Sequence, residues 1–196
     1  MKKKITAIFL CVALVAIAIA GASLAYFTDT DDAKNTFTVG NVKIDLTEPN
    51  WEKTGKEEAK TVYAGEPLAK DPTVENKGDN PCFVRIKVEG LKQFGTKGNI
   101  TYRTNYQDNK LGTGWVLHTD GYFYYTKVLE KEGDKTSALF DQIVMPTGLD
   151  GTETNVSPIT VTAQAVQAQG AKASFSAVKD MTVTEIAEWF KTCGMT

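Results

Sequence analysis

The residues able to do nucleophilic, acid–base or metal chemistry are few in this chain. Its 196 residues include a single histidine, His118, and three cysteines, Cys11, Cys82 and Cys193. A catalytic zinc takes three protein ligands dominated by histidine, and a nucleophilic cysteine is usually activated by a neighbouring base. The sequence has no His-Glu-x-x-His pattern. We therefore predict no catalytic residues, no metal site and no cofactor.

Three aspartates, Asp29, Asp31 and Asp32, stand close together in the sequence. Carboxylates alone suit calcium better than zinc. A solvated acidic segment has the same composition, and we expect that role here. His118 lies in a predicted hairpin strand, where we expect a packed or surface residue and not a metal ligand.

Cys82 and Cys193 leave two alternatives open. Outside the cell they can form one disulfide. Cys82 also falls on the inward face of a predicted strand beside Val84, where a buried free thiol behaves as a small apolar side chain.

Aromatic residues gather at Trp115, Tyr122, Phe123, Tyr124 and Tyr125. Alternation along a strand places these rings on both of its faces, and one face belongs to the core. The other face is a second core layer, a subunit contact or a platform on which carbohydrate stacks. We expect the second core layer.

The first 25 residues predict a secretory signal peptide. Three lysines precede a largely apolar run, 5–20, and Ser23 and Ala25 occupy the −3 and −1 positions of a cleavage site that makes Tyr26 the first mature residue. As a helix this run spans about 24 Å, short of the roughly 30 Å hydrocarbon core. We expect membrane contact only through the uncleaved signal peptide.

Cleavage leaves 171 of the 196 residues, and the 22 lysines and arginines become 19 against 24 acidic residues. This length is enough for one domain with a sizeable core. The acidic balance argues against nucleic acid or an anionic membrane surface as a partner.

Alternating apolar and polar residues predict an all-β, antiparallel sandwich over 41–196. The expected strands are 42–46, 61–64, 72–75, 82–88, 115–118, 122–129, 139–145 and 159–168. Asp120-Gly121 suits a tight hairpin turn between two of them. The polar stretch 48–60 is predicted to be a solvated loop.

Only the end of the chain departs from the β pattern. Thr182 and Glu185 have capping-box spacing, and apolar residues recur every three to four positions up to Gly194, a natural stop. We predict one short helix, 182–193, which covers an open end of the sandwich.

Two groups of residues carry a resemblance to a known family. The junction Leu24-Ala25-Tyr26-Phe27-Thr28-Asp29, the segment Asn35-Thr36-Phe37-Thr38-Val39-Gly40 and the strand that follows resemble the start of the TasA/camelysin family of Gram-positive exported proteins. The turn Glu75-Asn76-Lys77-Gly78 and its flanking strands are similar to a second part of the family pattern.

The resemblance implies processing by a signal peptidase of the SipW type and a jelly-roll-like sandwich. It also implies extracellular fibres of a biofilm matrix, in which the N-terminal strand is lent to the next subunit. Residues 26–40 are then the candidate donor strand, with Tyr26, Phe27, Phe37 and Val39 as assembly residues. An unpaired sheet edge accepts such a segment, and head-to-tail donation yields filaments. In the alternative, Phe37 and Val39 pair within their own subunit.

Three functions follow as hypotheses. The first is a self-associating structural subunit, secreted to the cell surface or biofilm matrix. The second is a monomeric secreted or cell-surface module for adhesion or glycan binding. The metalloprotease label attached to camelysin suggests a third, a metalloendopeptidase, but the sequence lacks a zinc-ligand motif and we expect no enzyme.

Overall fold

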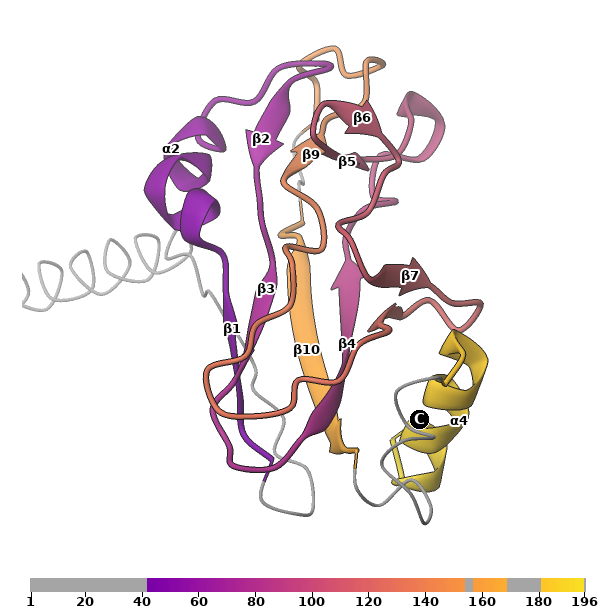
Figure 1. The fold of residues 1–196 in the computed structure, drawn as a ribbon. Helices are drawn as coiled ribbons and strands as arrows, with labels where there is room; N and C mark the ends of the chain where they lie inside the picture. The colour runs from indigo at the N-terminus through magenta and orange to yellow at the C-terminus, as the bar shows by residue number, and fades with distance from the viewer. Residues whose placement is uncertain (1–41, 154–156, 169–180, 196) are drawn as a thin grey trace, which may run out of the picture. The chain divides into compact units, whose positions relative to one another are not determined.

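Antiparallel strands form most of the regular structure in the computed structural model, which describes residues 42–153, 157–168 and 181–195 (Figure 1). The strands are β1 Ile44–Thr47, β2 Pro67–Ala69, β3 Thr73–Asn76, β4 Cys82–Glu89, β5 Thr101–Thr104, β6 Gln107–Asp108, β7 Trp115–Leu117, β8 Phe123–Tyr125, β9 Gln142–Val144 and β10 Thr160–Gln167. They are arranged as two four-stranded sheets and one two-stranded sheet.

The first four-stranded sheet has the order β10-β4-β8-β7. Its longest pairing joins β4 and β10, in register from Gln167 opposite Cys82 to Thr160 opposite Glu89. The predicted hairpin is confirmed, because β7 pairs with β8 and Gly121 has a φ of 84°. Glycine adopts this left-handed conformation without the steric penalty of a side chain.

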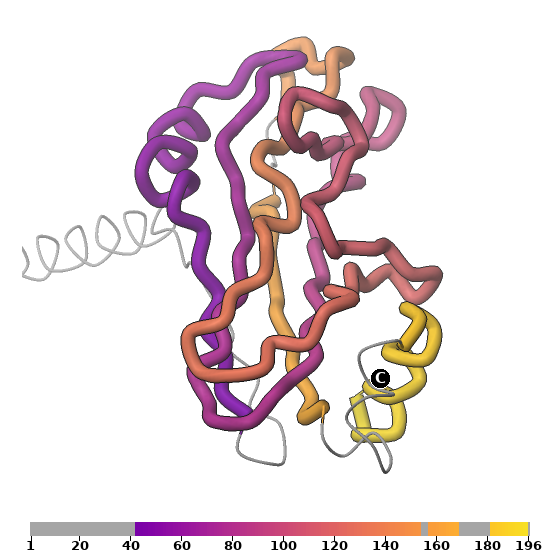
Figure 2. The backbone as a smooth tube through the Cα atoms, viewed as in Figure 1, coloured from indigo at the N-terminus to yellow at the C-terminus, as the bar shows by residue number. Residues whose placement is uncertain are grey.

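The second four-stranded sheet has the order β2-β9-β5-β6, and β1 pairs separately with β3. The tube in Figure 2 shows the chain before β9 running beside β3. Hydrogen bonds join the two, including Thr136 N to Val74 O at 2.9 Å and Leu139 N to Pro72 O at 2.8 Å. These hydrogen bonds connect β3, and through it β1, to the chain that leads into β9 of the second sheet.

A single apolar core lies between the two layers. Alternate residues of β4 and β10 supply one side of it, and β1, β3, β2 and β9 supply the other, as period-2 alternation requires. Its central members are Ile44, Leu46, Leu68, Val74, Val84, Ile86, Phe123, Ile143, Ala163 and Ala165. The predicted all-β sandwich is confirmed, whereas the jelly-roll connectivity stays a prediction.

The C-terminal helix α4 Val183–Thr192 matches its predicted bounds to within a residue. The capping box is present: the Thr182 hydroxyl accepts from Glu185 N, and the Glu185 carboxylate accepts from Thr182 N. The predicted position of the helix was wrong. It covers the outer face of the first sheet, because Ile186, Ala187 and Phe190 pack against apolar residues of β4, β8 and β10.

The polar stretch 48–60 is not the solvated loop that the sequence predicted. It forms a helical segment, η2 Trp51–Gly55 followed by α2 Lys56–Glu58. Asp71 Oδ1 accepts hydrogen bonds from Asn50 N and Trp51 N, at 2.9 and 3.3 Å, which satisfies backbone donors at the start of the segment.

Contacts with β2 and its continuation fix this helical segment in place. Lys70 Nζ lies 4.4 Å from the centre of the Trp51 ring and 2.9 Å from Glu48 Oε2. Gly55 is buried, and a Cβ there would lie 2.2 Å from Ala69 O. These long-range contacts are absent from the local sequence pattern.

Two further strand predictions need correction. Residues 61–64 form no strand, and β2 begins later, at Pro67. The hairpin of β5 and β6 was missed, because its strands are short and polar and its turn lacks glycine. Asn105 and Tyr106 form that turn with positive φ values of 51° and 60°.

Candidate functional site

The residues that the sequence assigns to export and assembly lie outside the described part of the chain. These are Ser23, Ala25 and Tyr26 at the cleavage site, and Tyr26, Phe27, Phe37 and Val39 in the candidate donor strand. The structure instead describes the sheet edges that such a strand would meet.

Among the described residues, β10 is the outermost strand on one side of the first sheet. Ala168 N donates to Pro81 O at 2.8 Å, so even-numbered residues of β10 direct their backbone groups toward β4. Val161 and Ala163 therefore direct theirs away from β4, and no strand in the described part of the chain pairs with them.

Strand β1 also has backbone groups that face away from the strand with which it pairs. Lys77 N donates to Lys43 O at 2.7 Å, so odd-numbered residues face β3 and the backbone groups of Ile44 and Leu46 face away from it. Part of β1 lies within 8 Å of β10, measured between Cα atoms. Strands β1 and β10 therefore lie close together.

His118 lies in a polar network with Asp120 and Tyr124. Its Nδ1 lies 3.2 Å from Asp120 Oδ1, within ion-pairing distance but without hydrogen-bond geometry. Burial raises the pKa of Asp120, but the hydrogen bonds from Tyr122 N and the Tyr124 hydroxyl, together with the nearby His118 side chain, outweigh it and leave that pKa below its usual value. Residues 42–153, 157–168 and 181–195 contain no cluster of three metal-ligating side chains.

The Tyr124 hydroxyl connects this network to a buried cation. It donates to Asp120 Oδ2 at 2.8 Å and accepts from Arg85 Nη1 at 3.0 Å. Arg85 Cζ lies 3.8 Å from the centre of the Tyr122 ring and 4.7 Å from that of Phe190. The guanidinium joins the sheet to α4 by these ring contacts, as cations bind aromatic faces.

The aromatic cluster is largely closed to ligands. Trp115, Phe123 and Tyr125 belong to the core between the sheets, whereas Tyr124 packs under α4. All four are buried, and only Tyr122 is half-buried. The second core layer is thus what the structure has, and these rings offer no platform for carbohydrate.

Both cysteines of the described residues are free thiols, Cys82 buried and Cys193 exposed. The disulfide alternative is therefore not formed. Cys82 lies in the core on β4 and Cys193 ends α4 on the outer face of the same sheet. Burial raises the pKa of the Cys82 thiol to about 12, so this residue is not a nucleophile.

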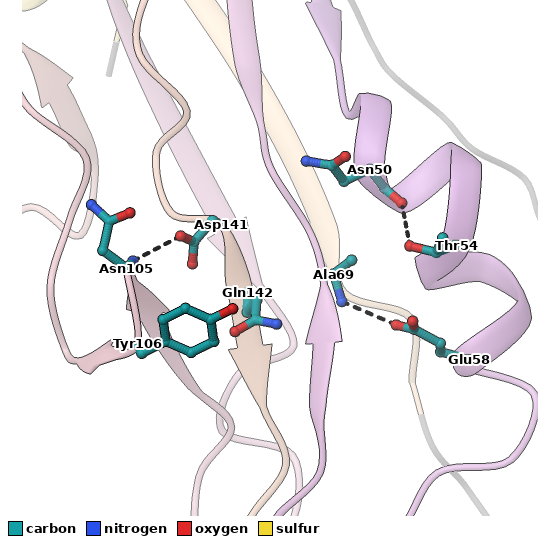
Figure 3. Close-up of a pocket in the computed structure, with 8 residues that line it drawn as sticks. All are labelled: Asn50, Thr54, Glu58, Ala69, Asn105, Tyr106, Asp141 and Gln142. Carbon is teal, nitrogen blue, oxygen red and sulfur yellow. Dashed lines mark hydrogen bonds between the residues drawn. The ribbon is translucent and has the colours of Figure 1, made fainter.

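A polar pocket of about 470 Å³ lies between the helical segment 50–58 and the second sheet. Figure 3 shows Asn50, Thr54 and Glu58 on one side and Asn105, Tyr106, Asp141 and Gln142 on the other, with Ala69 between them. No sequence motif indicated this pocket, because its residues come from four separate parts of the chain.

Comparisons with known proteins give no further assignment. No protein-family model, curated protein or solved structure matches the chain. Within the described ranges, no helix combines the length and apolar character needed to span a membrane. The function is therefore argued from the geometry above and from the sequence.

Proposed function

We propose that this chain is an exported structural subunit of an extracellular fibre or biofilm matrix, assembled head to tail through a donated N-terminal strand. A signal peptidase of the SipW type would release it at Ala25, and it would act outside a Gram-positive cell, at the surface or in the matrix. It needs no catalytic group or cofactor for this role, and its main partner is another copy of itself.

The observation that carries the proposal is the outward edge of β10 beside that of β1. The backbone groups of Val161 and Ala163 face away from β4, and those of Ile44 and Leu46 face away from β3, in each case without a paired strand among the described residues. Edges of this kind accept an extended segment by main-chain hydrogen bonding, while alternate side chains of that segment enter the core.

The candidate donor has the matching pattern. Residues 26–40 precede β1 in the chain and contain Phe37 and Val39, spaced so that both fall on one face of a strand. Donation to the next subunit does not close on itself, so it gives filaments and not dimers.

The experiment compares the chain 26–196 with a version that lacks 26–40. Size-exclusion chromatography and negative-stain electron microscopy over time should show filaments from the longer chain and folded monomers from the shorter one. A peptide of residues 26–40, added in excess to the longer chain, should cap the filaments and shorten them. Monomers from both chains, with normal circular dichroism, would refute the proposal.

The aromatic cluster at β7 and β8 does not support the competing adhesion hypothesis, because its rings are largely buried. The peptidase hypothesis also lacks a basis in the described residues, since His118 contacts Asp120 and Tyr124 and no ligand cluster surrounds it.

A further inference from the structure

The turn between β5 and β6 carries an exposed aromatic residue in a strained conformation. Thr104 pairs with Gln107, so Asn105 and Tyr106 form a two-residue hairpin loop with both φ values positive. Such turns favour Asn-Gly, and a bulky side chain in the left-handed region costs about 1–2 kcal/mol. Tyrosine at this position is therefore unfavourable for folding.

The Tyr106 side chain also exposes its aromatic ring to water. Tyr106 is 84% exposed, more than any other large apolar side chain among the described residues. Its ring lies 5.7 Å from Arg103 Cζ, and the Arg103 Nε in turn donates to Gln142 at 2.7 Å. Arg103 thus contacts the Tyr106 ring at the pocket, but the ring remains exposed to solvent.

The pocket beneath this ring is lined by hydrogen-bonding groups (Figure 3). Asp141 Oδ2 accepts from Asn105 N at 2.8 Å, whereas Asp141 Oδ1 has no hydrogen-bond partner. Across the pocket, Glu58 accepts from Ala69 N at 3.3 Å. Asp141 Oδ1 is buried and out of a ligand's reach, so the acceptors at the pocket are Asp141 Oδ2 and the Glu58 carboxylate.

These features define the ligand's chemistry. The volume of about 470 Å³ falls in the range of pockets that hold small molecules, roughly 300–1,000 Å³. The lining is mostly amide, hydroxyl and carboxylate, which suits a polyhydroxylated molecule, and one exposed ring offers an apolar face for stacking. Two carboxylates line the pocket and no lysine or arginine does, which disfavours anionic ligands.

We propose that the pocket between Tyr106 and Glu58 binds a neutral hexose-based saccharide. One sugar face stacks on the Tyr106 ring, and sugar hydroxyls donate to Asp141 and Glu58 while the amides of Asn50, Asn105 and Gln142 exchange hydrogen bonds with the remaining hydroxyls. This site is separate from the β10 edge and does not depend on fibre assembly.

The test uses the chain 26–196 and measures binding to cellotetraose, maltotetraose, laminaritetraose and N-acetylchitotetraose by isothermal titration calorimetry, which works for monomers and filaments alike, with tetragalacturonate as the anionic comparison. We expect at least one neutral tetrasaccharide to bind, and the anionic one to bind more weakly. If none of the four neutral probes binds, the proposal is overturned.

Variants of the turn separate binding from folding. Tyr106→Gly restores the preferred turn sequence, so it should raise the midpoint of thermal unfolding by about 2–4 °C while weakening binding about tenfold. Tyr106→Phe keeps the ring and should keep the affinity. Tyr63→Ala removes another exposed tyrosine, 64% exposed and outside the pocket, and serves as the matched control. Unchanged binding by Tyr106→Gly, or equal loss with Tyr63→Ala, would contradict the assignment.

Discussion

At the scale of single residues, the most unusual feature is the buried guanidinium of Arg85. Its Nε donates to Gln164 at 2.7 Å, and its planar group lies between the Tyr122 and Phe190 rings. Delocalised charge and weak hydration make arginine the cation best suited to such a position. The residue links the sheet to α4 without a direct carboxylate partner in the described residues.

The two thiols should differ in reactivity. Cys82 is buried with a pKa of about 12, whereas Cys193 is exposed. Because the thiolate is the reactive form, iodoacetamide should label Cys193 in the native chain 26–196 and label Cys82 only after denaturation. Mass spectrometry of peptides locates the label. Labelling of both residues only after reduction would show that they form a disulfide instead.

Alkaline pH should destabilise the fold. Burial raises the pKa of Cys82 and of Tyr124 to about 12, from 9.0 and 10.0. In each case the folded state holds its proton more tightly than the unfolded chain does. This contribution to the free energy of unfolding is therefore complete below about pH 9 and is lost as the pH rises to about 12.

Urea titrations at about pH 8 and about pH 11 measure this loss. The Cys82→Ala variant starts from a lower stability, because it shortens a core side chain, but its stability should fall less between the two pH values. An identical fall in the variant and the parent chain would remove Cys82 as a cause.

At the scale of elements, α4 depends on its apolar face and not on its own helix propensity. Ten residues are too few for a stable isolated helix. Three buried side chains, Ile186, Ala187 and Phe190, supply the stabilisation by packing on the outer face of β4 and β8. Helix α4 therefore also buries the outer face of β4, the face opposite the core.

Phe190→Ala should lower the free energy of unfolding by about 3–5 kcal/mol. The Phe190 ring is fully buried and meets the Tyr124 ring edge to face, with centroids 5.5 Å apart. Lys191→Ala is the matched control on the same helix, because its ion pair with Glu188 is exposed and should contribute about 0–1 kcal/mol. Equal effects of the two substitutions in urea denaturation would contradict the packing role of α4.

At the scale of the whole molecule, the sandwich combines a closed core with outward strand edges at β1 and β10. Natural proteins usually protect such edges against pairing with other chains. Here β10 contains neither lysine nor proline among its eight residues, and the side chains of Val161 and Ala163 are buried in the core. That composition favours strand addition.

Ala163→Pro should stop filament growth, and it should also lower the stability of the subunit, because Ala163 is fully buried in the core. Its N–H points away from β4, so proline removes a donor at the outward edge and no ladder bond. Thr162→Pro is the matched control, because the Thr162 N–H faces β4 and its loss should unfold the sheet. Circular dichroism and electron microscopy distinguish the outcomes, and filaments from a folded Ala163→Pro chain would exclude this edge as the acceptor.

The elements with local signals could be predicted from the amino-acid sequence. Alternation over eight residues specified β4 and β10, Asp120-Gly121 specified the β7–β8 turn, and the capping box specified the start of α4. Each signal arises from backbone geometry within a few residues, so it can be recognised without knowing what packs against it.

Other features depend on contacts between residues far apart in the chain, and these could not be predicted from the sequence. The segment 48–60 is helical because Lys70 and Asp71 contact it, and β4 is buried on both faces because α4 covers one of them. The pocket at Tyr106 likewise brings together residues from four separate stretches. Packing energies of this kind override weak local preferences, and no pattern within a short window of sequence encodes them.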